Sequence, residues 1–105
     1  MHPVIADKSE ALAALCRRYR VRRLEVFGSA ARGHDFDPAR SDVDFLVAFE
    51  KEAGLSPLNQ FFGFAEALEV ELGRPVDLVE RGALEASRNY IRRRNILADA
   101  EVVYG

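Results

Sequence analysis

The chain has 105 residues and a mass of 11.8 kDa, so we expect a single domain over residues 1–105 and no second domain. Hydrophobic residues make up 49% and charged residues 30% of the chain, a balance that excludes disordered, collagen-like and low-complexity proteins. Fifteen Lys and Arg against seventeen Asp and Glu give a net charge of -2, which argues against an extended nucleic-acid-binding surface.

The sequence carries no targeting or membrane signal. No segment approaches the roughly 20 apolar residues of a membrane span, and residues 1–6 do not resemble a signal peptide. The single cysteine, Cys16, has no partner for an intramolecular disulfide and falls on the apolar stripe of a predicted helix. We therefore interpret Cys16 as a core residue rather than a reactive thiol, and we expect a cytoplasmic protein that does not bind membranes.

The first predicted helix begins at a capping-box pattern, in which Asp7 is followed three residues later by Glu10. It runs to about Tyr19. Cations near this end suit the negative pole of the helix dipole, and we interpret five arginines there as a solvated face: Arg17, Arg18, Arg20, Arg22 and Arg23.

The next part of the chain predicts two strands joined by a small-residue turn and a loop. Residues 24–27 form a short apolar strand, and the small residues of 29–32 predict one or two helical turns. Residues 34–40 predict a loop in which His34 is solvated. Apolar residues then alternate over 43–49, which predicts a strand with two distinct faces.

A strongly amphipathic helix is predicted next. Ser56 is its cap, Pro57 its first residue and Gly73 its end. Its apolar stripe is interpreted as core and consists of Leu58, Phe61, Phe62, Ala65, Leu68 and Leu72. The remaining elements are a strand over 76–79, a helix over about 84–98 and a strand over 101–104. The order αβ(α)βαβαβ predicts a layered domain of helices and strands, and periodicity leaves the strand directions open.

Gly28 and Ser29 stand at a strand-to-helix turn. Glycine lets the backbone bend sharply and approach a ligand, and a helix start offers amide donors that suit phosphate oxygens. Ser29 adds a hydroxyl donor at the same place. The alternative is that the two residues make only a turn and a helix cap.

Asp42 and Asp44 point the same way from one predicted strand, with Cα atoms roughly 6.6 Å apart. At an effective dielectric constant near 20, two unit charges about 6 Å apart repel by roughly 2.8 kcal/mol, so a cation between them is favourable. Mg²⁺ fits, because one or two carboxylates together with substrate phosphates commonly hold it. Alternatively, Asp42 caps a turn after Ser41 and Asp44 pairs with one of the 13 arginines.

Asp77 interrupts the apolar strand over 76–79. A carboxylate in the middle of a strand can be a third metal ligand contributed by a neighbouring strand, or a base for an attacking hydroxyl. It can equally be the partner of a salt bridge. The choice depends on whether Asp77 lies close to Asp42 and Asp44.

Three motifs together resemble the minimal nucleotidyltransferases, the small members of the DNA polymerase beta-like nucleotidyltransferase superfamily: VFGSAARG at 26–33, SDVDFLV at 41–47 and RPVDLV at 74–79. The resemblance covers almost the whole chain and implies an α+β fold, with a small mixed sheet flanked by helices. It implies that Gly28 and Ser29 bind the triphosphate of a nucleotide. The carboxylates of Asp42, Asp44 and Asp77 would carry catalysis and hold Mg²⁺, with two ions expected.

The position of Arg32 implies either a positive contact to the triphosphate or a surface residue after a short helix. One departure from the family pattern concerns the loop between the motifs. Twelve residues separate Ser29 from Asp42, where the common motif has ten. A longer surface loop accounts for this difference without moving either strand.

The resemblance implies transfer of AMP from ATP to an acceptor hydroxyl, with release of pyrophosphate. Small members of the family pair with a helical HEPN protein as antitoxin and toxin, and some modify a tyrosine of that partner with AMP. We therefore expect a Mg²⁺-dependent nucleotidyltransferase that acts as the antitoxin of a HEPN-type toxin in a hetero-oligomer. Within 105 residues we expect no further domain for the acceptor, so another protein would bring it.

Two other functions stay open at this point. The domain can neutralise a helical partner by covering it, without catalysis, or the carboxylates can serve a metal-dependent phosphatase or nuclease. RNA binding through Arg92, Arg93 and Arg94 is disfavoured, because three consecutive helical residues span about 200° and cannot form one flat patch. We interpret these arginines as a solvated helix surface.

Overall fold

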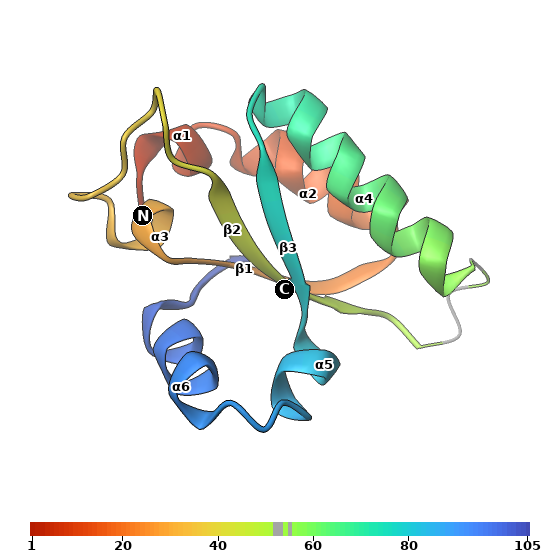
Figure 1. Ribbon diagram of the computed structural model, residues 1–105. Coiled ribbons are helices and arrows are strands. Elements are labelled where there is room, and N and C mark those ends of the chain that lie inside the picture. The colour runs from red at the N-terminus through yellow and green to blue at the C-terminus, as the bar shows by residue number, and fades with distance from the viewer. Residues whose placement is uncertain (52–53, 55) are drawn as a thin grey trace.

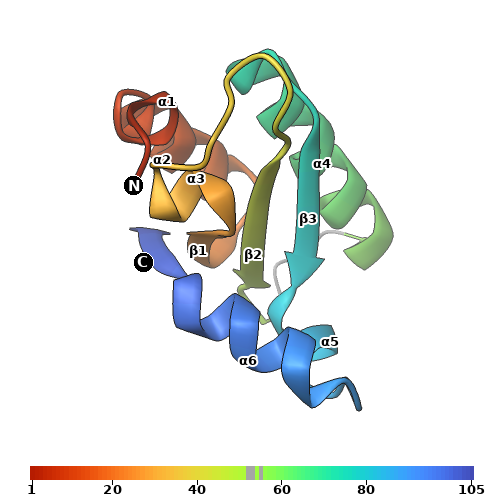
Figure 2. The same cartoon turned by 60° about the vertical axis from the view of Figure 1, so that its left-hand side comes forward.

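The computed structural model describes residues 1–51, 54 and 56–105, which form a four-stranded sheet with helices on both faces (Figure 1, Figure 2). The elements follow in the order α1 (Pro3–Ala6), α2 (Ser9–Arg18), β1 (Val21–Phe27), α3 (Ser29–Arg32), β2 (Val43–Phe49), α4 (Pro57–Leu72), β3 (Val76–Glu80), α5 (Arg81–Glu85), α6 (Tyr90–Asp99) and β4 (Glu101–Tyr104). In the described part of the chain, no helix has the length and apolar character needed to cross a membrane.

The sheet is mixed, which confirms the predicted fold class. Its strand order is β3-β2-β1-β4, and β1 runs antiparallel to both of its neighbours. β2 and β3 are parallel, in a register that pairs Val43 with Val76 and ends with Val47 beside Glu80. The helix α4 makes the crossover that a parallel pair requires.

The two faces of the sheet are covered by different helices. One face carries the main core, formed with α1, α2, α3 and α4 by residues that include Leu24, Val26, Phe45, Val47, Phe64 and Leu68. The other face packs against α5 and α6 through a smaller cluster of Phe27, Leu46, Leu84 and Ile96. Because side chains alternate along a strand, Asp44 and Asp77 belong to this second face, where the core is thin.

The beginning of the chain differs from the prediction. Two helices, α1 and α2, replace the single helix expected from Asp7, which instead closes α1. The capping-box prediction is wrong, because the residue before α2 is Lys8 and its side chain makes no capping hydrogen bond. His2 caps α1 by accepting a hydrogen bond on Nδ1 from the Val4 amide. Cys16 is buried in the core as predicted, and burial raises the pKa of its thiol to about 12.

The ends of α4 confirm the prediction, and its buried face confirms the prediction only in part. Ser56 accepts a hydrogen bond from the Asn59 amide, and Gly73 closes the helix with a φ of 65°. The buried positions are Gln60, Phe64, Leu68 and Leu72, whereas Leu58 and Phe62, predicted as core, are 66% and 60% exposed. Gln60 can occupy a buried position because its amide donates to the Tyr19 carbonyl at 2.7 Å.

The helix predicted over 84–98 is two helices, α5 and α6. Glu80 caps α5 by accepting hydrogen bonds from the amides of Gly82 and Ala83. Asn89 caps α6 by accepting one from the Arg92 amide at 3.0 Å. These two caps start separate helices and so explain the break between them.

Candidate active site

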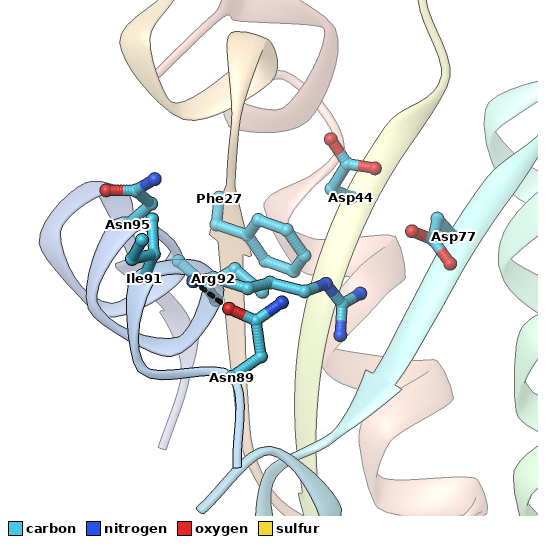
Figure 3. A pocket seen from close by; sticks show the side chains of 8 residues that line it. Phe27, Asp44, Asp77, Asn89, Ile91, Arg92 and Asn95 are labelled. Carbon is cyan, nitrogen blue, oxygen red and sulfur yellow. Dashed lines mark hydrogen bonds between the residues drawn. The ribbon is translucent and has the colours of Figure 1, made fainter. Parts of the chain in front are cut away.

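The parallel pairing of β2 and β3 brings Asp44 and Asp77 together. They are direct partners in the register, and they project from the same face of the sheet (Figure 3). Neighbouring strands lie about 4.8 Å apart, so the two carboxylates share one space although 32 residues separate them in the chain. The resemblance of the two motifs to a family implied that Asp44 and Asp77 share one site. The parallel register of β2 and β3 is what places them side by side.

The electrostatics of Asp44 show that negative charge gathers at this point. Its pKa is raised to about 6, first by burial and then by the carboxylates of Asp77 and Asp42. Asp42 is exposed just before β2, and its charge still reaches Asp44. The positive charge of Arg32 acts in the opposite direction and lowers the pKa of Asp44. A cation bound beside Asp44 would relieve this repulsion.

Gly28 lies against Asp44 at the end of β1. Its backbone has a φ of 70° and a ψ of -150°, a region that is essentially restricted to glycine. A Cβ atom at this position would also stand 2.5 Å from Asp44 Oδ2, closer than two such atoms can approach. The backbone conformation therefore favours glycine, and a side chain at this position would displace the Asp44 carboxylate. Ser29 begins α3 directly after the bend.

Arg32 stands at the end of α3 and is held by two carboxylates. Its guanidinium forms ion pairs with Asp35, at 2.8 Å, and with Asp99 at the end of α6. These contacts link the glycine-serine turn to α6. Arg32 does not contribute to the lining of the cavity described next.

A cavity of about 600 Å³ opens between the sheet and α6. Asp44 and Asp77 line it from the sheet, and Phe27 and Ile96 supply apolar surface. The rest of the lining comes from α6 and was missed by the sequence analysis: Asn89, Ile91, Arg92 and Asn95. The sequence does carry a signal for this part of the lining. The polar residues 89, 92 and 95 recur every third position and therefore share one side of a helix.

The carboxylates suit a magnesium ion that is shared with a ligand. Among the residues that the structure describes, no three His, Cys, Asp or Glu side chains converge closely enough to hold a metal ion by themselves. Mg²⁺ does not need such a closed set, because one or two carboxylates plus phosphate oxygens and water complete its coordination. Asp44 and Asp77 provide that partial set, and the raised pKa of Asp44 marks an unbalanced negative charge.

Comparison with known proteins places the chain in a family. The nucleotidyltransferase domain family matches residues 8–100 of the chain. The protein adenylyltransferase MntA of Thermococcus cleftensis is 42% identical over 72 residues, which cover 69% of this chain and 68% of that protein.

Solved structures agree on the fold. A chain provisionally described as a minimal nucleotidyltransferase superposes with a TM-score of 0.71 and 33% identity, covering 96% of this chain and 95% of the other. A chain from the complex of a tri-AMPylated Shewanella oneidensis HEPN toxin with an MNT antitoxin has a TM-score of 0.61 and 18% identity, over 95% of this chain and 71% of that one. The chain therefore belongs to the nucleotidyltransferase domain family and is a relative of the MntA-like protein adenylyltransferases.

Proposed function

We propose that the chain is a Mg²⁺-dependent enzyme that transfers AMP from ATP to a hydroxyl group of a partner protein. The observation that carries this proposal is the pair of Asp44 and Asp77, side by side at the cavity, with the charge of Asp42 added to theirs. Similarity to a protein adenylyltransferase supports the choice of AMP and of a protein acceptor.

Each residue of the site has a proposed role. Asp42, Asp44 and Asp77 would hold Mg²⁺, two ions by the family resemblance, and Mg²⁺ supplies positive charge to the phosphates and to the acceptor oxygen. Gly28 lets the chain approach the triphosphate, and the amides and hydroxyl at Ser29 donate to phosphate oxygens. Arg32 remains a candidate phosphate contact, which would require it to exchange its partners Asp35 and Asp99.

The chemistry is a displacement at the α-phosphorus of ATP. The acceptor oxygen forms a bond to this phosphorus, the bond to the bridging oxygen of the β-phosphate breaks, and pyrophosphate leaves with its electron pair. The acceptor proton passes to Asp77, which stands beside Asp44 on the open face of the sheet. Hydrolysis would follow the same course with water as the acceptor.

The partner we propose is a helical HEPN-type toxin, with a tyrosine hydroxyl as the acceptor and this chain as the antitoxin in a hetero-oligomer. The fold shared with a chain of a toxin-antitoxin complex, together with the similarity to a protein adenylyltransferase, supports this partner. A partner is also consistent with several large apolar side chains on the surface, among them Tyr90, Ile91 and Val70.

The test is co-expression with candidate helical partners, beginning with the product of the adjacent gene. The purified pair is incubated with ATP labelled at the α-phosphate and Mg²⁺, and the labelled residue is mapped by mass spectrometry. We expect label on a tyrosine of the partner, and none when Asp44→Asn replaces the wild type. Neutralisation of the toxin without any label would favour a non-catalytic antitoxin, and pyrophosphate release with free AMP would favour hydrolysis.

A further inference from the structure

The wall of the cavity that faces the two aspartates is formed by α6, and Arg92 is the basic residue in its lining. Figure 3 shows the Arg92 side chain extending from α6 toward β2 and β3, into the space that Asp44 and Asp77 also face. The cavity therefore has carboxylates on the sheet side and a guanidinium on the helix side.

The three consecutive arginines of α6 point to different places. Arg93 donates to the Glu85 carbonyl at 3.1 Å, and its guanidinium lies over the Tyr90 ring, 5.4 Å from the centroid. Arg94 is exposed and lines a separate groove with Tyr90 and Leu97. Arg92 alone of the three lines the cavity. Arg92 and Arg94 are both exposed, as the interpretation of a solvated helix surface predicts, but only Arg92 borders the cavity.

The Arg92 guanidinium is available to a ligand. Within residues 1–51, 54 and 56–105 it forms no ion pair, whereas Arg32 is engaged with both Asp35 and Asp99. The backbone at Arg92 is also held in place. Its amide is bound by the Asn89 cap, and Ile96, one turn later, is buried in the cluster with Phe27.

We propose that Arg92 binds the phosphate chain of the nucleoside triphosphate, opposite the aspartates, so that α6 is a wall of the nucleotide site. This inference rests on the proposed function and adds the group that attracts the substrate. Carboxylates repel a polyphosphate unless cations lie between them, whereas a guanidinium attracts it directly and offers paired donors to phosphate oxygens. Arg92 is thus a phosphate contact in addition to the candidate Arg32, which would first have to leave Asp35 and Asp99.

The experiment measures the dissociation constants of AMP-PNP with Mg²⁺ and of adenosine, the latter by competition, for the wild type, Arg92→Ala and Arg94→Ala. Arg94 is the matched control, since it is an exposed arginine of the same helix outside the cavity. We expect Arg92→Ala to weaken AMP-PNP binding by about tenfold or more, because charge-assisted hydrogen bonds to phosphate are lost. Adenosine has no phosphate, so its affinity should stay unchanged, and Arg94→Ala should match the wild type for both ligands.

Three results would overturn the role of Arg92: unchanged AMP-PNP affinity in Arg92→Ala, an equal loss of AMP-PNP and adenosine affinity, or an equal loss in Arg94→Ala. The equal loss for both ligands would mean that Arg92 only maintains the shape of the cavity. If the wild type transfers AMP while Arg92→Ala binds AMP-PNP normally, this inference fails and the proposed function stands. If the wild type binds no AMP-PNP with Mg²⁺, both fail.

Discussion

Gly28 combines two constraints at one residue, a backbone conformation that only glycine adopts easily and an Asp44 carboxylate that would stand 2.5 Å from any added Cβ. We expect Gly28→Ala to lower the free energy of unfolding by about 1–3 kcal/mol through backbone strain and to abolish nucleotide transfer by displacing Asp44. Denaturant unfolding and the transfer assay measure the two effects.

Gly73→Ala is the matched control for Gly28. Gly73 also has a positive φ, of 65°, but a Cβ there meets nothing within 4 Å. This variant should lose about 1 kcal/mol of stability, as an L-residue in the left-handed region does, and keep its activity. Full activity in Gly28→Ala would contradict the close approach to Asp44.

The raised pKa of Asp44 predicts how stability depends on pH. Since its pKa rises from an ordinary value of 3.8 to about 6, the folded state holds this proton more tightly than the unfolded chain. The resulting stabilisation is full below pH 3.8 and is lost as the pH rises toward about 6. Above that pH the ionised carboxylate opposes folding.

Asp44→Asn should therefore be more stable than the wild type at pH 8 and equally stable at pH 3.5. Asp44 is partly exposed, so solvent screening limits the gain to about 1 kcal/mol, or about 4 °C in melting temperature. Thermal unfolding at both pH values, without Mg²⁺, measures it. A lower melting temperature for Asp44→Asn at pH 8 would mean that the carboxylate has a stabilising partner.

Single residues were partly predictable. The pair Asp42 and Asp44 and the glycine before Ser29 stand in recognisable motifs, because their chemistry depends on short spacings along the chain. Arg92 could not be identified in this way. The spacing of residues 89, 92 and 95 places Arg92 on a polar side of a helix, but the direction in which that side faces depends on where α6 lies relative to β2 and β3.

Among the elements, α4 shows how a helix can have the predicted ends and a buried face that was predicted only in part. Its caps are local signals, so Ser56 and Gly73 were predictable. The burial of Gln60 was not, since it depends on a hydrogen bond to Tyr19 on another element. Phe62, in contrast, is 60% exposed, because the buried side of α4 is the one that carries Gln60, Phe64 and Leu68.

The buried face of α4 predicts unequal effects on stability for substitutions of two of its phenylalanines. Phe64 is 0% exposed and Phe62 is 60% exposed. We expect Phe64→Ala to lower the free energy of unfolding by about 3–5 kcal/mol and Phe62→Ala to change it by less than about 0.5 kcal/mol. Urea unfolding of both variants measures the difference. Equal losses would place Phe62 in the core, as the apolar periodicity alone suggested.

The whole molecule is a sheet between two layers of helices, and the two faces of the sheet have different roles. α2 and α4 cover one face of the sheet, and α5 and α6 cover the other (Figure 2). The first face carries the larger buried apolar cluster, and Asp44 and Asp77 line the cavity between the second face and α6. The order of elements predicted a layered domain of helices and strands, and the α+β class came from the resemblance of its motifs to a family. The order of elements did not predict the strand order, because antiparallel β1–β2 and parallel β2–β3 pairing arise from contacts between distant segments.

The central claim is that Asp44 and Asp77 form one catalytic centre for AMP transfer. The most direct measurement supplies ATP labelled at either the α- or the γ-phosphate, with Mg²⁺ and the partner, to the wild type, Asp44→Asn, Asp77→Asn and the exposed control Asp7→Asn. We predict that α-label appears on the partner and γ-label in pyrophosphate, with both lost in the first two variants and retained in Asp7→Asn. Transfer that persists in Asp77→Asn, or γ-label on the partner, would contradict the claim.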